Sequence, residues 1–370
     1  MSSSDMQQRS ATGNKALSGA KKAKQDEFYT QLVDIEKEIK YYKKQMRDKV
    51  ILCNCDDPFE SNFFRYFALN FNSLGLKKLI ATSYIKSTIA GDYLPLLALA
   101  GLRPEGKEPY AIEINEVPDH QHRGATDLAD VEYLLKHDAN TSRSLNPDGI
   151  YDGGDFRSQE CIELLKQADI VVTNPPFSLF REFVADLVKY KKQFLIIGNV
   201  NALHYKEIFR LIKDNKLWLG ESIHSGDREF RVPHHYPLEA AGSRIDEQGN
   251  KYIRVKGVRW FTNMDNPKRH ENLPLYKKYS ADEYPTYDNL DAIEVSKASE
   301  IPCDYYGLMG VPDTFLDKFN PDQFEILGIP FGNLGKEIGV TKNHRGRTDI
   351  AITKDGKSRC PYSRIIIKRK

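Results

Sequence analysis

Residues 169–180 have the sequence DIVVTNPPFSLF, and they give the clearest indication of how the chain folds. Residues 170–172 form a short, β-branched apolar run, which is typical of a strand buried in a parallel sheet. Residues 174–177 then end the strand, because each proline fixes φ and lacks the N–H that a strand ladder needs. We therefore predict a central strand that stops in a rigid turn.

The turn suits a planar ring that has an exocyclic amino group. The Asn174 side chain and the Pro175 carbonyl can accept hydrogen bonds, Pro176 donates none, and Phe177 offers a flat apolar face. The amine of adenine is a poor nucleophile, because its lone pair is delocalised into the ring. Hydrogen bonds to these acceptors would localise the lone pair for attack on a methyl sulfonium, without a metal or a covalent protein nucleophile. We predict these four residues to be catalytic.

A plain loop after the strand is the alternative interpretation. The aromatic at position 177 and the apolar run before the turn favour an active site. The four residues resemble the catalytic motif of amino-methyltransferases, in which Asn or Asp, two prolines and an aromatic follow a central strand.

The composition indicates one sizeable α/β domain and a smaller appended one. The chain has 370 residues, 40% of them hydrophobic, and a net charge of +2, so any surface for nucleic acid has to be local. Its five cysteines show neither paired metal-ligand spacing nor an even disulfide framework, which fits a reducing cytosol. Without an apolar signal core or a run of membrane-spanning length, we expect a soluble, cytoplasmic protein.

Helical and strand patterns alternate between residues 25 and 220, after a flexible basic arm at residues 1–24. Strands are expected at 49–57, 77–84, 193–198 and from 217, and helices at 31–47, from 61, at 161–167, 180–190 and 201–215. This alternation predicts an α/β fold with a doubly wound, Rossmann-like sheet. Residues 85–151 are interpreted as an insertion of hairpins and loops.

Cofactor-binding residues are expected beyond the carboxyl ends of the strands, where ligands bind in open α/β sheets. The turn after the first strand offers Asp56, Asp57 and Ser61, with Ser61 as a possible helix N-cap, although the glycines usual in such loops are missing. Asp155 could accept a hydrogen bond from the adenine amine of a cofactor, with Phe156 packing on its ring. An acid that complements a helix dipole explains Asp155 equally well.

From residue 221 the composition changes to basic and aromatic residues, which extend to residue 370. Residues 252–261 alternate like an edge or hairpin strand, and basic side chains interleaved with aromatics at that spacing suit phosphate contact and base stacking. A solvated strand face is the alternative. The candidate DNA-binding residues are Arg228, Arg231, His235, Arg254, Lys256 and Arg259.

A metal site is not expected. His234 and His235 lack further ligands at metal-binding spacing.

Several segments together resemble the EcoRI-type family of adenine-specific DNA methyltransferases, over nearly the whole length after the N-terminal arm. Residues 174–177 alone are common to amino-methyltransferases, whereas the set in this order is more specific. The segments are residues 26–30 (DEFYT), 53–58 (CNCDDP), 174–177 (NPPF), 259–263 (RWFTN) and 362–367 (YSRIII).

This resemblance implies methyl transfer from S-adenosyl-L-methionine to N6 of an adenine flipped out of a short site in double-stranded DNA, and a target-recognition region in residues 221–370. Asn174, Pro175 and Phe177 would hold and stack the base. Phe28, Tyr29 and Thr30 match a cofactor motif that precedes the first strand. Residues 57–63 stand where the superfamily has Asp-Pro-Phe and a Gly-rich turn, and that turn is absent here.

Two other functions remain open at this stage. The same turn also serves methyltransferases that act on RNA or on protein glutamine, and a decayed scaffold could bind DNA without catalysis. We expect a monomer, because one strand is modified at a time. A cognate restriction endonuclease would act on the same site without forming a stable complex.

Overall fold

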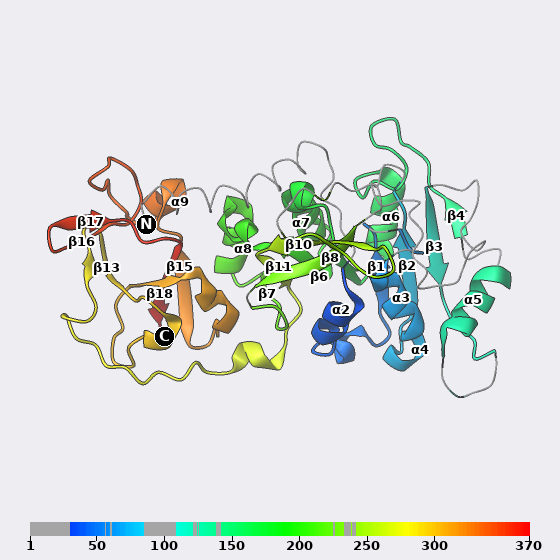
Figure 1. Cartoon of the computed structure of the whole chain (residues 1–370), viewed down its shortest axis with the longest axis horizontal. Coiled ribbons are helices and arrows are strands. Elements are labelled where there is room, and N and C mark those ends of the chain that lie inside the picture. Colours follow the sequence, from blue (N-terminus) through cyan, green and yellow to red (C-terminus); the bar gives the residue numbers. More distant parts are fainter. Residues whose placement is uncertain are drawn as a thin grey trace. The chain divides into compact units, whose positions relative to one another are not determined.

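The computed structural model describes residues 30–55, 57–59, 61–84, 109–120, 124, 126–137, 142–224, 226–232, 238 and 242–370. Their elements, drawn in Figure 1, belong to two compact units. The first unit comprises residues 1–202 and 225–264, and the second comprises residues 203–224 and 265–370. Residues 258–262 pair with a strand of the first unit, which accounts for the place of residues 225–264 in that unit.

Seven strands of a large mixed sheet lie in the first unit, in the order β4-β3-β2-β1-β5-β6-β11. The neighbouring strands β2, β1, β5 and β6 run parallel to one another. The other pairs are antiparallel: β3 with β2, β4 with β3, and β11 with β6. The strands are β1 (Val50–Cys53), β2 (Lys78–Thr82), β3 (Tyr110–Ile114), β4 (Ser142–Ser144), β5 (Ile170–Thr173), β6 (Gln193–Asn199) and β11 (Val258–Thr262).

Helices cover both sides of this sheet. In Figure 1, α2, α3 and α4 lie in the lower half of the first unit, and α6 and α7 lie in its upper half. Every residue of β1 and β5 is buried, as expected for parallel strands covered on both faces. The helices are α2 (Leu32–Ile39), α3 (Asn62–Leu69), α4 (Phe71–Leu74), α5 (Leu128–His137), α6 (Gln159–Gln167) and α7 (Phe180–Lys189), with 3-10 turns η1 (Lys43–Met46), η2 (Phe177–Leu179) and η3 (Val200–His204).

Aromatic side chains fill the core between the sheet and its helices. Trp260 on β11 meets Phe63 on α3 edge to face, with 6.0 Å between ring centroids, and Phe180 on α7 meets Phe261 at 5.0 Å. Such pairs add to the stabilisation from burial of their apolar area. The core thus ties α3 and α7 to the sheet on which the predicted catalytic turn lies.

Three sequence predictions differ from the structure in detail. The helix expected at residues 31–47 ends at Ile39 and is followed by η1, and the insertion at 85–151 contains α5 besides the strands β3 and β4. The strand expected at 252–261 is two strands, because Gly257 between them has φ +69. A Cβ at Gly257 would lie 2.7 Å from Cγ1 of Val200, so the turn requires glycine.

The strand before Gly257 belongs to a small antiparallel sheet with the order β8-β10-β9. Its strands are β8 (Asp227–Val232), β9 (Arg244–Ile245) and β10 (Lys251–Lys256). Phe230, Val232, Ile253 and Val255 bury one face of this sheet, and polar side chains occupy the other.

The second unit is built on a five-stranded sheet with the order β12-β13-β14-β18-β15. The closing strand predicted at the C-terminus is β18, which lies between β14 and β15. The elements are β12 (Thr286–Tyr287), β13 (Leu290–Glu294), β14 (Met309–Pro312), β15 (Phe324–Gly328), β18 (Arg364–Arg369), the hairpin β16 (Ile352–Lys354) and β17 (Lys357–Arg359), β7 (Trp218–Leu219), α8 (Lys206–Lys213), α9 (Gly332–Glu337), η4 (Pro267–His270), η5 (Ala298–Glu300) and η6 (Asp313–Lys318). In the part of the chain that the structure describes, no helix has both the length and the apolar character that crossing a bilayer requires.

A buried ion pair joins β13 to β18 in this unit. The Arg364 guanidinium donates to both carboxylate oxygens of Glu294, at 2.5–3.1 Å, and the Tyr287 hydroxyl donates to the same carboxylate. The Glu294 and Arg364 side chains are only 3% and 14% exposed. Burial, together with the Glu294 charge, holds the pKa of Tyr287 well above its usual range, so this hydroxyl stays protonated and keeps donating.

We expect Glu294→Gln to lower the free energy of unfolding by about 3 kcal/mol, because it leaves the buried Arg364 charge without its counter-ion. Urea unfolding followed by circular dichroism measures the change. The control is Glu300→Gln, which breaks the exposed pair with Lys297 at 3.7 Å and should shift the unfolding free energy by less than about 0.5 kcal/mol. Similar shifts for the two variants would contradict this assignment.

Candidate active site

The predicted catalytic turn lies at the carboxyl edge of the large sheet. Because β2, β1, β5 and β6 run parallel, their carboxyl ends meet at one edge, where ligands bind in open α/β sheets. The register pairs Leu52 with Val171 and Thr173 with Ile196. Asn54 after β1 and Asn174 after β5 therefore begin neighbouring turns.

The turn itself is short and well packed. Asn174 is only 2% exposed and Pro175 is buried, whereas Pro176 and Phe177 are partly exposed. The Pro176 carbonyl accepts a hydrogen bond of 3.0 Å from the Leu179 amide, which closes η2 and leads directly into α7. The amide side chain is thus held inside the protein, while the aromatic ring reaches the surface beside it.

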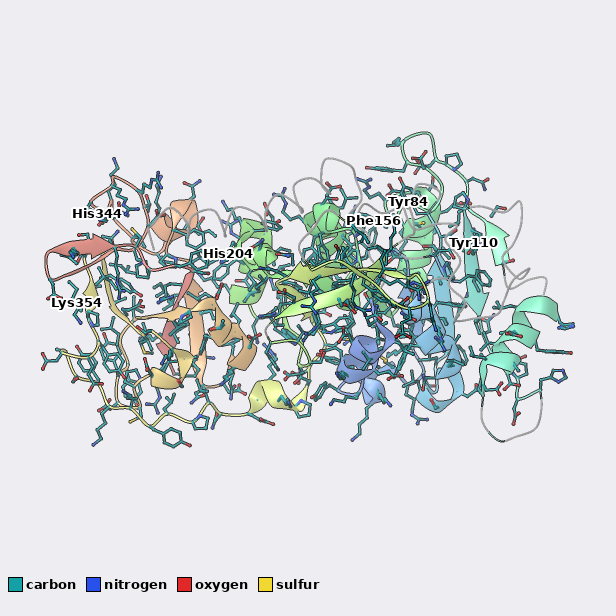
Figure 2. The ribbon with its side chains drawn as sticks, viewed as in Figure 1. Tyr84, Tyr110, Phe156, His204, His344 and Lys354 are labelled. Carbon is teal, nitrogen blue, oxygen red and sulfur yellow. The ribbon has the colours of Figure 1, made fainter. Side chains whose placement is uncertain are left out.

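The loop at residues 152–157 reaches the same edge because Gly154 lies against the backbone of Ser83. A Cβ at Gly154, which has φ +78, would lie 1.9 Å from the carbonyl oxygen of Ser83, just after β2. Only glycine permits this backbone contact. Asp155 and Phe156 therefore lie beside the carboxyl end of β2, and Figure 2 labels Phe156 close to Tyr84.

Asp155 and Phe156 are both engaged by protein side chains. The Asp155 carboxylate accepts from the Arg157 guanidinium at 2.8 and 3.0 Å, and Phe156 packs edge to face on Phe183 at 5.0 Å. Hydrogen bonds to Asp155 raise the pKa of Arg157, which also pairs with Glu182 at 3.0 Å. The sequence analysis did not anticipate this pairing, which fixes the position of the carboxylate.

Tyr110 is a residue at this edge that the sequence analysis missed. Its hydroxyl donates to Asp57 Oδ1 at 2.9 Å, and its amide donates to the Ser83 hydroxyl at 2.8 Å. It begins β3, which runs antiparallel to β2 and so starts where β2 ends. No sequence pattern identified Tyr110, because residues 85–151 were interpreted as an insertion of hairpins and loops.

The other predicted cofactor residues lie around the start of α3. Ser61 accepts from the Phe63 amide at 3.1 Å and is the N-cap, as predicted. The Thr30 carbonyl accepts from the Asn62 side chain at 2.7 Å, and the buried Thr30 hydroxyl has no hydrogen-bond partner among the described residues. Phe28, Tyr29 and Asp56 lie outside the described residues.

The candidate DNA-binding residues do not form one surface. Arg231, Arg254 and Lys256 share the polar face of the small sheet, because β8 and β10 pair Arg231 with Tyr252 and Glu229 with Arg254. Arg228 lies on the opposite face, near Asp34. Burial raises the pKa of the Asp34 carboxyl, and the Arg228 charge offsets part of that rise.

Arg259 differs from these residues in its burial. It lies on β11, is 7% exposed and donates to the Val258 carbonyl at 2.9 Å. His234 and His235 are outside the described residues. Among the residues that are described, no three His, Cys, Asp or Glu side chains are grouped as metal ligands.

Comparison with known proteins identifies the family. A family model described as adenine-specific methyltransferase EcoRI matches residues 16–370. The chain belongs to this family. Its membership confirms the class predicted from residues 174–177, and the chain is an adenine-specific DNA methyltransferase.

Two similar relatives share almost the full length of the methyltransferase. The Type II methyltransferase M.EcoRI of Escherichia coli is 46% identical over 369 residues, which cover 98% of each chain. The Type II methyltransferase M.MpnI of Mycoplasma pneumoniae is 38% identical over 360 residues, 95% of this chain and 97% of the relative. No solved structure matches the chain.

We expect Gly154→Ala to destabilise the methyltransferase and to lower methyl transfer to DNA, because the Ser83 carbonyl must move away from the new methyl group. Thermal unfolding and the rate of methyl transfer measure the two effects.

The matched control is Gly149→Ala, at a glycine that also has positive φ, +88, but has no atom within 4 Å of its Cβ position. It should lose only about 1 kcal/mol of unfolding free energy, from backbone strain alone, and keep its activity. Equal losses in both variants would show that the close approach at Ser83 is unimportant.

Proposed function

We propose that this methyltransferase moves a methyl group from S-adenosyl-L-methionine to N6 of an adenine flipped out of a short double-stranded DNA site. The observation that supports the proposal is the position of residues 174–177: they follow the buried strand β5, at the edge where the other parallel strands also end. Flipping is needed because the N6 atom of a stacked, paired adenine is out of reach.

Each residue of the turn has a proposed part in binding the base. The Asn174 side chain and the Pro175 carbonyl accept hydrogen bonds from the N6 amine and localise its lone pair. Phe177, partly exposed at the mouth of the turn, stacks on the ring. Pro176 fixes the backbone between them, since its φ is −54. The N–C bond forms as the S–C bond of the methyl donor breaks, which leaves a neutral thioether. The amine then loses one proton to water, and no protein nucleophile is required.

We propose that the cofactor is held by Thr30, Asp57, Ser61, Asp155 and Phe156, together with Phe28, Tyr29 and Asp56. The described members lie at the carboxyl ends of β1 and β2 and the start of α3, and the unpartnered Thr30 hydroxyl there suits a polar ligand. When bound, S-adenosyl-L-methionine supplies an electrophilic methyl group. Tyr110, through its bond to Asp57, positions the turn after β1.

The fold supports the same proposal. The strand order β2-β1-β5-β6 has β1 and β5 at its centre, and successive connections move outward in opposite directions, as in a doubly wound, Rossmann-like sheet. We propose that residues 221–370 provide target recognition. Their DNA contacts include Arg231, Arg254 and Lys256 on the open face of the small sheet.

The remaining candidates and partners are also part of this proposal. Arg228, His235 and Arg259 are the other proposed DNA contacts, and the two described arginines would need their neighbours to shift before they met a phosphate.

The protein would act as a cytoplasmic monomer. A restriction endonuclease for the same site would be a functional partner without a stable complex.

The direct test is sequencing with modified-base detection, on DNA from cells that express this chain and no other methylase. N6-methyladenine confined to one short motif is the expected result. Unmodified DNA from cells that contain the folded protein would overturn the proposal, and labelled methyl groups found in RNA or protein instead would identify another acceptor.

Asn174→Ala should reduce methylation by at least about 100-fold, because one acceptor for the reacting amine is lost. Binding of S-adenosyl-L-methionine, measured by calorimetry, should stay within about twofold, since the proposed cofactor residues are untouched. An active Asn174→Ala variant would refute the catalytic assignment.

Phe177→Ala should lower turnover more than duplex binding. Loss of base stacking is worth about 1–3 kcal/mol, which corresponds to roughly 5- to 150-fold in the fraction of flipped, reactive adenine. Single-turnover methylation and a fluorescence anisotropy assay of duplex binding separate the two effects. Phe177→Trp is the control and should keep most of the turnover; equal losses in Phe177→Ala and Phe177→Trp would argue against stacking.

A further inference from the structure

The hairpin β16–β17 in the second unit is exposed but firmly anchored. Ile352, at its base, is 1% exposed and packs in a core cluster with Tyr287 and Ile366. On the other face, Thr353 donates to the Asp288 carboxylate through both its amide, at 3.1 Å, and its hydroxyl, at 2.7 Å. All residues from 353 to 359 are exposed.

The tip of the hairpin is a two-residue turn. Asp355 and Gly356 have φ values of +52 and +70, as in the type I′ turns whose twist matches that of paired strands. The hairpin is therefore a regular two-stranded ribbon. Figure 2 labels Lys354, the last residue of β16. A ribbon of this kind fits the major groove of DNA.

The hairpin concentrates positive charge on one face. The register pairs Lys354 with Lys357 and Ile352 with Arg359, so the side chains of Lys354, Lys357 and Arg359 share a face. Like charges placed directly opposite each other destabilise a strand pair. None of the three forms an ion pair with a residue in the described part of the chain.

Two other exposed lysines of this unit are paired. Lys277 lies 3.6 Å from Glu283, and Lys297 lies 3.7 Å from Glu300. The adjoining loop adds three more exposed cations, Lys342, Arg345 and Arg347. A surface that holds unpaired cations against their mutual repulsion is suited to an extended polyanion.

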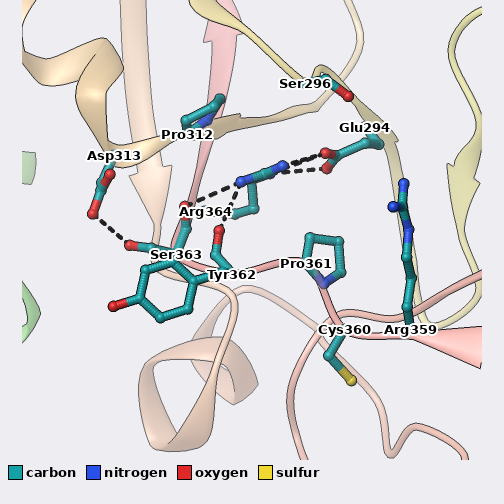
Figure 3. Close-up of a pocket in the computed structure, with 10 residues that line it drawn as sticks. All are labelled: Glu294, Ser296, Pro312, Asp313, Arg359, Cys360, Pro361, Tyr362, Ser363 and Arg364. Carbon is teal, nitrogen blue, oxygen red and sulfur yellow. Dashed lines mark hydrogen bonds and ion pairs between the residues drawn. The ribbon is translucent and has the colours of Figure 1, made fainter. Parts of the chain in front are cut away.

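An exposed aromatic ring adjoins the hairpin. Tyr362 is 87% exposed, and with Arg359 it borders a cavity of about 420 Å³, shown in Figure 3. The backbone that carries this ring is fixed, because Arg364, held by Glu294, donates to the Tyr362 carbonyl at 2.7 Å. A fixed, exposed tyrosine beside unpaired cations can pack on a sugar or a base edge.

We propose that the hairpin β16–β17 is a DNA-contact finger of this methyltransferase. Lys354, Lys357 and Arg359 bind phosphates of the duplex on either side of a groove, and Tyr362 packs on the nucleotide next to them. This inference rests on the proposed function, and it adds residues that lie outside the small sheet of the first unit. The occupant is double-stranded DNA, because phosphates along a duplex match cations along a ribbon.

The test is the salt dependence of duplex binding by the variant Lys354→Gln/Lys357→Gln, measured by fluorescence anisotropy with the full chain. Loss of two phosphate contacts should lower the slope of log K against log salt concentration by about 2 and weaken binding on the order of 10- to 100-fold at 0.1 M salt. Arg359→Gln alone should lower the slope by about 1. Tyr362→Ala should weaken binding without changing the slope, and Tyr362→Phe should restore it.

The matched control is Lys277→Gln/Lys297→Gln, which removes two charges from paired lysines of the same unit and should leave the slope unchanged. Urea unfolding checks that the hairpin variant is at least as stable as the wild type, since a repulsion has been removed. An unchanged slope in the hairpin variant, or an equal loss in the control, would overturn the inference.

Wild-type methylation, assayed in parallel, separates this inference from the proposed function. If the wild type methylates DNA and the hairpin variant binds the duplex equally well, only the finger is refuted. If the wild type does not methylate DNA, the proposed function fails first. Tighter binding of the finger residues to single-stranded RNA than to duplex DNA would also refute the proposed occupant.

Discussion

The parallel pairing of β1 with β5 is the interaction on which the candidate active site depends. Only two residue pairs define its register, Ile51 with Ile170 and Leu52 with Val171, and both strands are completely buried. A shift of one residue would turn each side chain to the opposite face of the sheet and bury a different set. The same register places the turns after β1 and β5 side by side, so the packing of the core also aligns the residues proposed for the cofactor and for the base.

Much of this arrangement could be predicted, because it follows from local composition. An apolar β-branched run followed by two prolines allows few conformations, so β5 and its turn were predictable from residues 170–177 alone. Ser61 could be recognised as a helix cap by its position before an aromatic-rich helix. The strand order was not visible in any single segment, but the alternation of strands and helices restricted the possible topologies.

The contacts that complete the site could not be predicted, because they join segments that are distant in sequence. Tyr110 reaches Asp57 across 53 positions, and Arg157 reaches Glu182 across 25. Neither has a periodic pattern, since each acts through one polar group at the end of an element. The burial of Arg259 was equally hidden: a basic residue in an alternating segment suggests an exposed face, and only the structure shows that every residue of β11 is buried.

Gly257 has a mechanical consequence for the first unit. It is the only residue between β10, whose open face has two of the proposed DNA contacts, and β11, which pairs with β6 next to β5, the strand that leads into the candidate catalytic turn. One residue provides just two soft backbone dihedrals, and the position of Val200 restricts the space around them. With one residue at this junction, a force on β10, such as the proposed DNA contacts would exert, would pass directly to β11 in the large sheet, because no longer linker lies between the two strands.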